Sequence, residues 1–197
     1  NLYFNGSAIT VKCSSHEGIE SKGTIDFNGG EVYAYASDDA INASSHMTIN
    51  DGYICAYSTS NDGLDANGNL YIKGGVVYAV GASSPEVGID ANTEGGYKLY
   101  ITGGTIVAIG GLESGSSLSQ AVITNSSWSK STNYALYNGD TELMTFKSPA
   151  SGGSSMVMSC GSLTSGNSYT LKSGVTLSGG TQHFDGLYIE GATVSGG

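Results

Sequence analysis

Acidic and amide residues recur in a fixed pattern over the first half of the chain. The pattern occurs in four similar blocks, His16-Glu-Gly-Ile-Glu-Ser, Asp38-Asp-Ala-Ile-Asn-Ala, Asn61-Asp-Gly-Leu-Asp-Ala and Glu86-Val-Gly-Ile-Asp-Ala. Carboxylate and amide oxygens are hard ligands that suit Ca²⁺, and no His or Cys recurs with them, which disfavours zinc. The sequence therefore predicts calcium, with these ligands: Asp38, Asp39, Asn42, Asp62, Asp65 and Asp90.

The same residues have a simpler interpretation as turn formers. Asp and Asn side chains accept hydrogen bonds from the local backbone and are common at the ends of short strands. This explains single positions, but it does not explain why an oxygen-bearing side chain returns in every block.

The blocks belong to a longer repeat that predicts how they are positioned. Five segments align: Leu2-Tyr-Phe-Asn-Gly, Ile25-Asp-Phe-Asn-Gly, Met47-Thr-Ile-Asn-Asp, Leu70-Tyr-Ile-Lys-Gly and Leu99-Tyr-Ile-Thr-Gly. Their first residues are 23, 22, 23 and 29 positions apart, and another apolar residue follows seven positions after each. Each unit alternates apolar and polar residues in short stretches separated by Gly, Asn and Asp, which is typical of β-strands. One unit cannot bury its own apolar stripe, so the units must stack.

We therefore predict an all-β fold, a right-handed parallel β-helix with three strands per coil. Coils occupy residues 1–111, and residues 112–197 form a C-terminal β-rich segment that packs on the helix within a single domain. Stacked coils lie about 4.8 Å apart, about twice a calcium–oxygen distance, so an ion between two coils would contact both. A string of antiparallel hairpins is the alternative, because Asn5-Gly6 and Asn28-Gly29 are strong turn signals. Hairpins explain the first two stretches of each unit but not the acidic block that follows them as a third stretch.

The first six residues, NLYFNG, differ by one residue from the tail of a common protease-cleavage tag. Such segments are excluded from fold reasoning when they are foreign. NLYFNG fits the register of the repeat, so we interpret it as part of the native sequence.

The repeat also carries a family resemblance. The segments SDDAINAS, NDGLDANGNLYIKGGVVYAVG and VGIDAN, with SQAVIT and GNSYTLKSG further on, resemble the bacterial β-helix carbohydrate-binding domain family, which is similar in fold to pectate lyases. The resemblance implies a calcium-containing domain, secreted or on the bacterial cell surface. It also implies binding of plant-type polysaccharide such as cellulose or polygalacturonate, without catalysis.

Tyrosines alternate with the inward apolar residues and should form two outward columns. In the first stretch we expect Tyr3, Tyr71 and Tyr100, together with Asn50 and Lys73, to bind sugar, because aromatic faces with a polar rim suit sugar rings. In the second stretch, apolar residues share the columns of Tyr33, Tyr35, Tyr57 and Tyr78, so we expect the C-terminal half to cover these tyrosines. Trp128 fits either a sugar contact or a packing role.

Catalysis is the runner-up interpretation. Polygalacturonases of this fold use Gly-His-Gly and Arg-Ile-Lys elements, and neither occurs here. A calcium-dependent uronate lyase needs a base beside the metal; the chain has no arginine, so Lys73 is the candidate. A third possibility is a surface adhesin or structural module with a protein partner.

Charge and composition exclude other classes. Seven lysines face 17 acidic residues, giving a net charge of −10, which disfavours nucleic acid as a partner. No apolar run approaches the roughly 20 residues of a membrane span. The three cysteines are odd in number and show neither a disulfide framework nor metal-site spacing.

Overall fold

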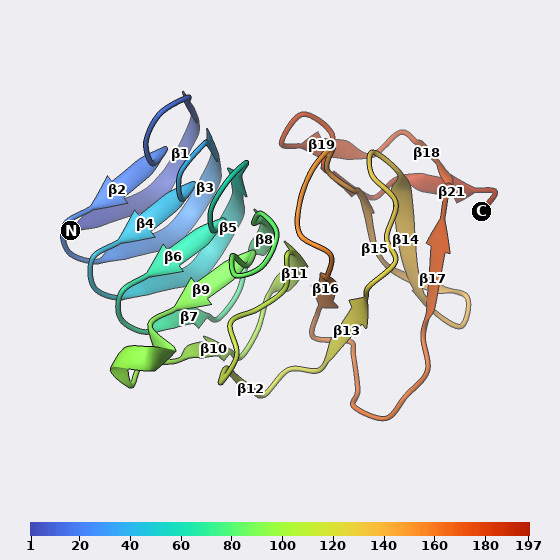
Figure 1. The fold of residues 1–197 in the computed structure, drawn as a ribbon. Helices are drawn as coiled ribbons and strands as arrows, with labels where there is room; N and C mark the ends of the chain where they lie inside the picture. The colour runs from blue at the N-terminus through green and yellow to red at the C-terminus, as the bar shows by residue number, and fades with distance from the viewer.

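The alternating apolar residues of the first half form a β-solenoid of about four turns, with small sheets added after it (Figure 1). The structure is a computed structural model that describes residues 1–197. One face of the solenoid consists of β1 (Leu2–Cys13), β3 (Ile25–Ala36), β5 (Met47–Ser58), β7 (Leu70–Ile72), β8 (Val76–Val80), β10 (Leu99–Ile101) and β11 (Thr105–Ile109). The other consists of β2 (Ile19–Ser21), β4 (Ile41–Ala43), β6 (Leu64–Ala66) and β9 (Ile89–Ala91).

Neighbouring coils pair in parallel and in the register of the sequence repeat. Leu2 pairs with Ile25, Ile25 with Met47, Met47 with Leu70 and Leu70 with Leu99. This confirms the stacked repeat and excludes the hairpin alternative. NLYFNG is accordingly an integral part of the first coil.

The first two stretches of a coil are less separate than expected. They run together as one 12-residue strand in β1, β3 and β5, and they are distinct strands in the fourth coil, β7 and β8, and in the next coil, β10 and β11. The long strands bend at a register irregularity, and glycine permits the bend: Gly52 has φ +106°, and a Cβ there would lie 3.0 Å from the carbonyl oxygen of Gly30.

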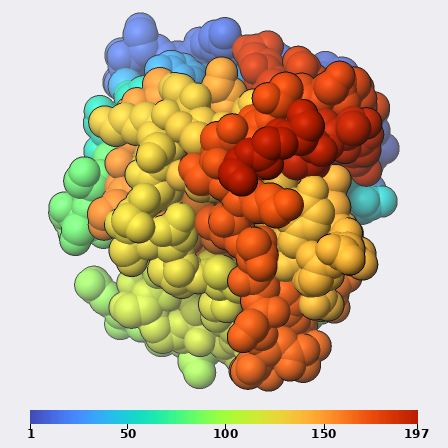
Figure 2. All heavy atoms as spheres, turned by 90° about the vertical axis from the view of Figure 1, so that its right-hand side faces the viewer, coloured from blue at the N-terminus to red at the C-terminus, as the bar shows by residue number.

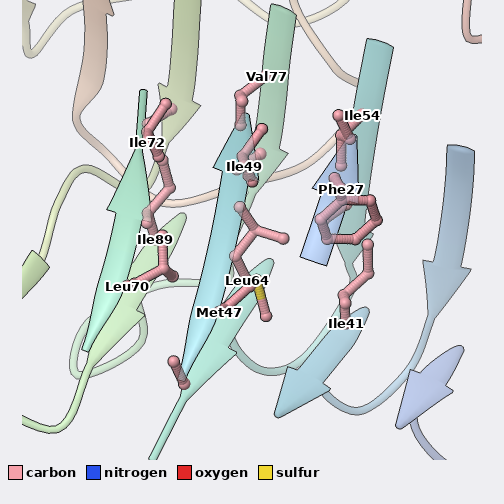
Figure 3. Close-up of a cluster of buried hydrophobic side chains, with 14 of the residues drawn as sticks. Phe27, Ile41, Met47, Ile49, Ile54, Leu64, Leu70, Ile72, Val77 and Ile89 are labelled. Carbon is pink, nitrogen blue, oxygen red and sulfur yellow. The ribbon is translucent and has the colours of Figure 1, made fainter. Parts of the chain in front are cut away.

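Inward side chains of the coils after the first, together with Val157 of the later segment, form one apolar core of 24 buried residues, part of which is drawn in Figure 3. The first coil packs against this core with the partly buried Leu2, Phe4 and Ile19. Phe27, Ile49 and Ile72 reach it from the long face, and Ile41, Leu64 and Ile89 from the short strands. Burying a side chain of this size contributes about 1.5–3 kcal/mol. The core therefore fixes which residue of each short strand must face outward.

The rest of the chain builds smaller sheets beside the solenoid. Its elements are η1 (Thr93–Gly95), β12 (Ser117–Leu118), β13 (Val122–Asn125), β14 (Asn133–Asn138), β15 (Thr141–Lys147), β16 (Met156–Ser159), β17 (Thr170–Ser173), β18 (Thr176–Ser178), β19 (Thr181–His183), β20 (Tyr188–Glu190) and β21 (Thr193–Ser195). β16 and β13 extend the long solenoid sheet antiparallel to β11, whereas β17-β14-β15-β20-β19 is a separate sheet.

A second apolar core of 16 buried residues joins this later sheet to the outer face of the solenoid. Tyr78 is fully buried there beside Phe146, and Tyr57 is also buried. The expectation that the second-stretch tyrosines are covered is thus confirmed, with Tyr33 and Tyr35 partly buried at the margin. Figure 2 shows this covered side, where later segments, yellow to red, hide the early coils except at the edges.

All three cysteines are free thiols, which agrees with the absence of a disulfide framework in the sequence. The single helical segment, η1, spans three residues, and no helix meets the length and apolarity of a membrane span.

Candidate metal and carbohydrate sites

The short strands place the acidic column on the outside of the solenoid. In β6 and β9 the flanking residues, such as Leu64 and Ile89, are buried in the core, so the central Asp65 and Asp90 project outward. Parallel pairing stacks Glu20, Asn42, Asp65 and Asp90 as consecutive partners. These four residues occupy the fifth position of the four acidic blocks, so the structure stacks them in the register of the sequence repeat.

The turn before each short strand supplies a second column of acidic side chains, which contains Asp39 and Asp62. Oδ1 of Asp39 accepts a hydrogen bond from the backbone N–H of Asp62 at 3.1 Å, and Oδ1 of Asp62 accepts one from the N–H of Val87 at 2.7 Å. These bonds tie one turn to the next, and the carboxyl group of Asp62 also lies within hydrogen-bond reach of Asp90. Asp62 is thus a turn former whose carboxyl group also meets the central aspartates of the short strands.

Asp62, Asp65 and Asp90 form a triad in which one carboxylate oxygen from each residue lies within 4.8 Å of the other two. The triad lies in an open hollow of about 410 Å³, whose acidic lining residues are Asp62, Asp65, Glu86, Asp90, Glu94 and Glu113. No lysine or histidine lines it. A hollow with six carboxyl groups and no cationic side chain could hold a metal ion.

The protonation of these groups reflects their crowding. Burial, together with the charge of Asp39, raises the pKa of Asp62 and of Asp65 to about 7. Burial also raises the pKa of Asp90 to about 9, helped by a hydrogen bond to Glu113. Without a cation, the hollow therefore retains protons near neutral pH, and a divalent ion would compete with them.

The other three predicted ligands lie beside the triad rather than in it. Nδ2 of Asn42 donates to Oδ2 of Asp65 at 2.7 Å and to Oδ2 of Asp39 at 3.3 Å, so both lie one coil before the triad. Oδ1 of Asp38 accepts from Nδ2 of Asn61 at 2.6 Å and from the backbone N–H of Asp39. Asp38 therefore belongs to a neighbouring turn network.

Glu113 is a member of the hollow that the sequence analysis missed. Leu112 bridges to Ile89 in parallel, which places Glu113 beside Asp90 as the next step of the column. The signal was present, because Glu113 lies 23 residues after Asp90, the repeat length of earlier coils. The predicted coils end at residue 111, so the prediction left Glu113 outside the column.

Among the predicted sugar-binding residues, Tyr71, Tyr100 and Lys73 come together. The rings of Tyr71 and Tyr100 are stacked, with centroids 5.1 Å apart and planes 10° from parallel, and Nζ of Lys73 lies 5.4 Å from the centre of the Tyr71 ring. Because the two rings face each other along the column, one face of each is already occupied. The pair therefore offers edges, hydroxyl groups and an outer face to a ligand.

Asn50 and Tyr3 lie elsewhere on the same side. Nδ2 of Asn50 donates to Asn28, whose Nδ2 donates to Asn5, so the three amides form an exposed ladder that ends beside Lys73. Tyr3 is 61% exposed, but two coils with Asp26 and Thr48 in its column separate it from Tyr71. At about 4.8 Å per coil, Tyr3 lies about 14 Å away from Tyr71.

Comparison with known proteins identifies the family of the chain. The profile of a family described as carbohydrate-binding domain-containing protein matches residues 1–181. The chain belongs to this family. The matched residues include the solenoid, the acidic hollow and most of the C-terminal sheets. Membership in the family implies that the partner of this carbohydrate-binding domain is a carbohydrate. No significant match was found among curated proteins or among solved structures.

Proposed function

We propose that this carbohydrate-binding domain is a non-catalytic, calcium-bound polysaccharide-binding protein, secreted or on the bacterial cell surface. Its ligands would be plant-type glycans such as cellulose or polygalacturonate. The family match over residues 1–181 carries the proposal, and the Asp62–Asp65–Asp90 triad supports the calcium.

Calcium suits the acidic hollow better than other common ions. Ca²⁺ accepts six to eight oxygen ligands in flexible geometry, whereas Mg²⁺ requires a smaller octahedral site and zinc prefers His and Cys. The hollow supplies only oxygen atoms, from two adjacent coils and the turn before Asp65. An ion there would offset the burial and the repulsion that together raise the pKa of Asp62, Asp65 and Asp90.

Calcium would also determine which glycans can approach. The chain carries a net charge of −10, so a polyuronate is repelled unless a bound cation offsets the local charge. A calcium ion in an open hollow keeps coordination positions for carboxylate or hydroxyl oxygens of a ligand. The nearby face with Tyr71, Tyr100 and Lys73 adds one cation and two aromatic rings for further contacts.

The lyase alternative, with Lys73 as base, has less support. Nζ of Lys73 lies over the Tyr71 ring, and Lys73 does not line the acidic hollow. A base must reach the proton that the metal-bound uronate loses, within about 3 Å or through one water. The adhesin alternative has no specific observation in its favour.

Two measurements on the whole chain test the proposal. Elemental analysis and calorimetric titration should find bound calcium, and pull-down on insoluble cellulose and on polygalacturonate should retain the protein. Asp65→Asn should lower calcium affinity at least about tenfold, because it removes a charged oxygen ligand. Asp140→Asn, an exposed hairpin acid, should leave calcium affinity unchanged.

The outcomes separate the alternatives. Failure to bind any polysaccharide would refute the binding function, and Asp65→Asn with unchanged calcium affinity would refute the metal site. Release of unsaturated product from polygalacturonate, lost in Lys73→Ala, would establish the lyase instead.

A further inference from the structure

A second hollow lies at the junction between the solenoid and the C-terminal sheets, away from the acidic one. It has a volume of about 570 Å³ and lies between the segment 118–123, which contains the start of β13, and the loop 163–169 before β17. These two segments, yellow-green and orange, lie side by side at the bottom of Figures 1 and 2. We call this hollow the β13 cleft.

The lining of the β13 cleft combines apolar and neutral polar groups. Half of its 12 residues are hydrophobic, among them Val122, Ile123 and Leu163, and the others are Ser, Thr, Gly, Asn and Gln. No charged residue lines it, although 17 of the chain's residues are acidic. Its volume lies within the range of small-molecule sites, which measure about 300–1,000 Å³, and its mixed lining suits a ligand that has both apolar and neutral polar surface.

Gln120 lines the cleft, and two hydrogen bonds fix the orientation of its amide. Its Nε2 donates to the carbonyl oxygen of Gly104 and to Oγ of Ser159, both at 2.9 Å. The Gly104 carbonyl can only accept, so the amide cannot be turned around. Both amide hydrogens are therefore used, and Oε1 has no partner within the protein.

Tyr169 and Asn167 complete the polar rim. The hydroxyl oxygen of Tyr169 accepts a hydrogen bond from the backbone N–H of Thr164 at 2.7 Å, which fixes the ring and leaves the hydroxyl hydrogen free to donate. The side chain of Asn167 is exposed and makes no hydrogen bond to the protein. The lining thus combines the fixed amide of Gln120, the fixed hydroxyl of Tyr169 and the unpaired amide of Asn167 with six hydrophobic residues.

We propose that the β13 cleft binds a neutral saccharide, as a short oligosaccharide or the end of an uncharged glycan chain. Sugar rings combine apolar C–H faces with hydroxyl groups that both donate and accept, and they require no charged partner. The inference rests on the proposed carbohydrate-binding function and names a separate subsite for its uncharged ligands. Anionic uronates gain nothing from a cleft without cations on a protein of charge −10.

The test compares two soluble probes, cellotetraose and tetragalacturonate, on the calcium-saturated full chain by calorimetry and by NMR titration. Cellotetraose should perturb the amide signals of residues 118–123 and 163–169, and tetragalacturonate should not. Asn167→Ala and Tyr169→Phe should each lower the affinity for cellotetraose about five- to tenfold, because each removes one hydrogen bond to the sugar. The matched controls Asn138→Ala and Tyr97→Phe alter exposed residues outside the cleft and should leave that affinity unchanged.

The results distinguish this inference from the proposed function. A wild-type protein that binds polysaccharide, with cellotetraose affinity unaltered in both cleft variants, refutes the cleft and leaves the function intact. Equal perturbation of the cleft by both probes refutes its preference for neutral sugar. Absence of binding to every saccharide, soluble or insoluble, refutes the proposed function itself.

Discussion

At the scale of single residues, the acidic hollow forms because a solenoid places equivalent residues of successive repeats next to one another. Asp65 and Asp90 are directly paired across parallel strands, so the coil spacing alone brings two carboxylates close together. Like charges at that distance are unfavourable unless protons or a cation intervene. The sequence predicted this column because the four blocks share one pattern of apolar and oxygen-bearing residues, but Glu113 lies beyond residue 111, the predicted end of the coils.

The raised pKa values predict an unusual pH dependence for the calcium-free protein. In the unfolded chain these aspartates titrate near 3.9, but in the folded protein Asp62 and Asp65 titrate near 7 and Asp90 near 9. Between these limits the folded state binds more protons than the unfolded state, so its free energy of unfolding falls as pH rises. We expect a loss of at least about 1–2 kcal/mol between pH 5 and pH 8, after allowance for solvent screening.

Urea unfolding in the presence of a chelator, followed by Trp128 fluorescence, measures this dependence. Saturating calcium should remove most of the loss, because the ion replaces the protons. The variant with Asp62, Asp65 and Asp90 all changed to Asn should show a flatter profile. Stability of the calcium-free protein that increases from pH 5 to pH 8 would contradict the assignment.

At the scale of elements, turns rather than strands determine the shape of the hollow. The chain leaves β8 at Gly81 and returns through Val87 to β9, and the N–H of Val87 holds Asp62 in place. A Cβ added at Gly81 would lie 1.9 Å from the carbonyl oxygen of Val87, which is backbone and cannot rotate away. Position 81 therefore requires glycine, because the backbone of Val87 leaves no room for a side chain there.

Gly81→Ala should displace the 81–88 turn and, with it, Asp62. We expect a loss of about 1–3 kcal/mol in stability, as for other overpacked sites, together with weaker calcium binding. Gly161→Ala is the matched control, because a Cβ there meets no atom within 4 Å. Differential scanning calorimetry and calcium titration of both variants measure the effects, and normal calcium affinity in Gly81→Ala would show that the turn does not position the ligand.

The elements also mark the limit of prediction from the sequence. The repeat predicted which residues lie side by side on neighbouring coils, because each residue of β4, β6 and β9 pairs with the equivalent residue of the next repeat. The joined strands β1 and β3 were not anticipated, since the Asn-Gly step in each can bend a strand as well as end it. The β13 cleft was not predictable either, because residues 118–123 and 163–169 meet only through non-repeating tertiary contacts.

At the scale of the whole molecule, two cores share one sheet. The inner side of β8 packs in the solenoid through Val77 and Ala79, and its outer side packs against the C-terminal sheet through Tyr78. The hydroxyl of Tyr78 also donates to the carbonyl of Lys147 at the end of β15. Because the same strands belong to both cores, neither core can open without exposing the other's sheet, and the chain should unfold as one unit.

Phe146→Ala tests this cooperativity. The Phe146 ring is fully buried against Tyr134 and Tyr78, with centroid distances of 5.6 and 6.4 Å, so its loss should cost about 3–5 kcal/mol. We expect one transition, shifted to lower temperature, in circular dichroism, tyrosine fluorescence and calcium release alike. Phe4→Ala, at the partly buried end coil, should cost less and also give one transition. Calcium release at the wild-type temperature in Phe146→Ala would show instead that the solenoid is stable without its covering sheet, and that the acidic hollow and the β13 cleft belong to separately folding parts.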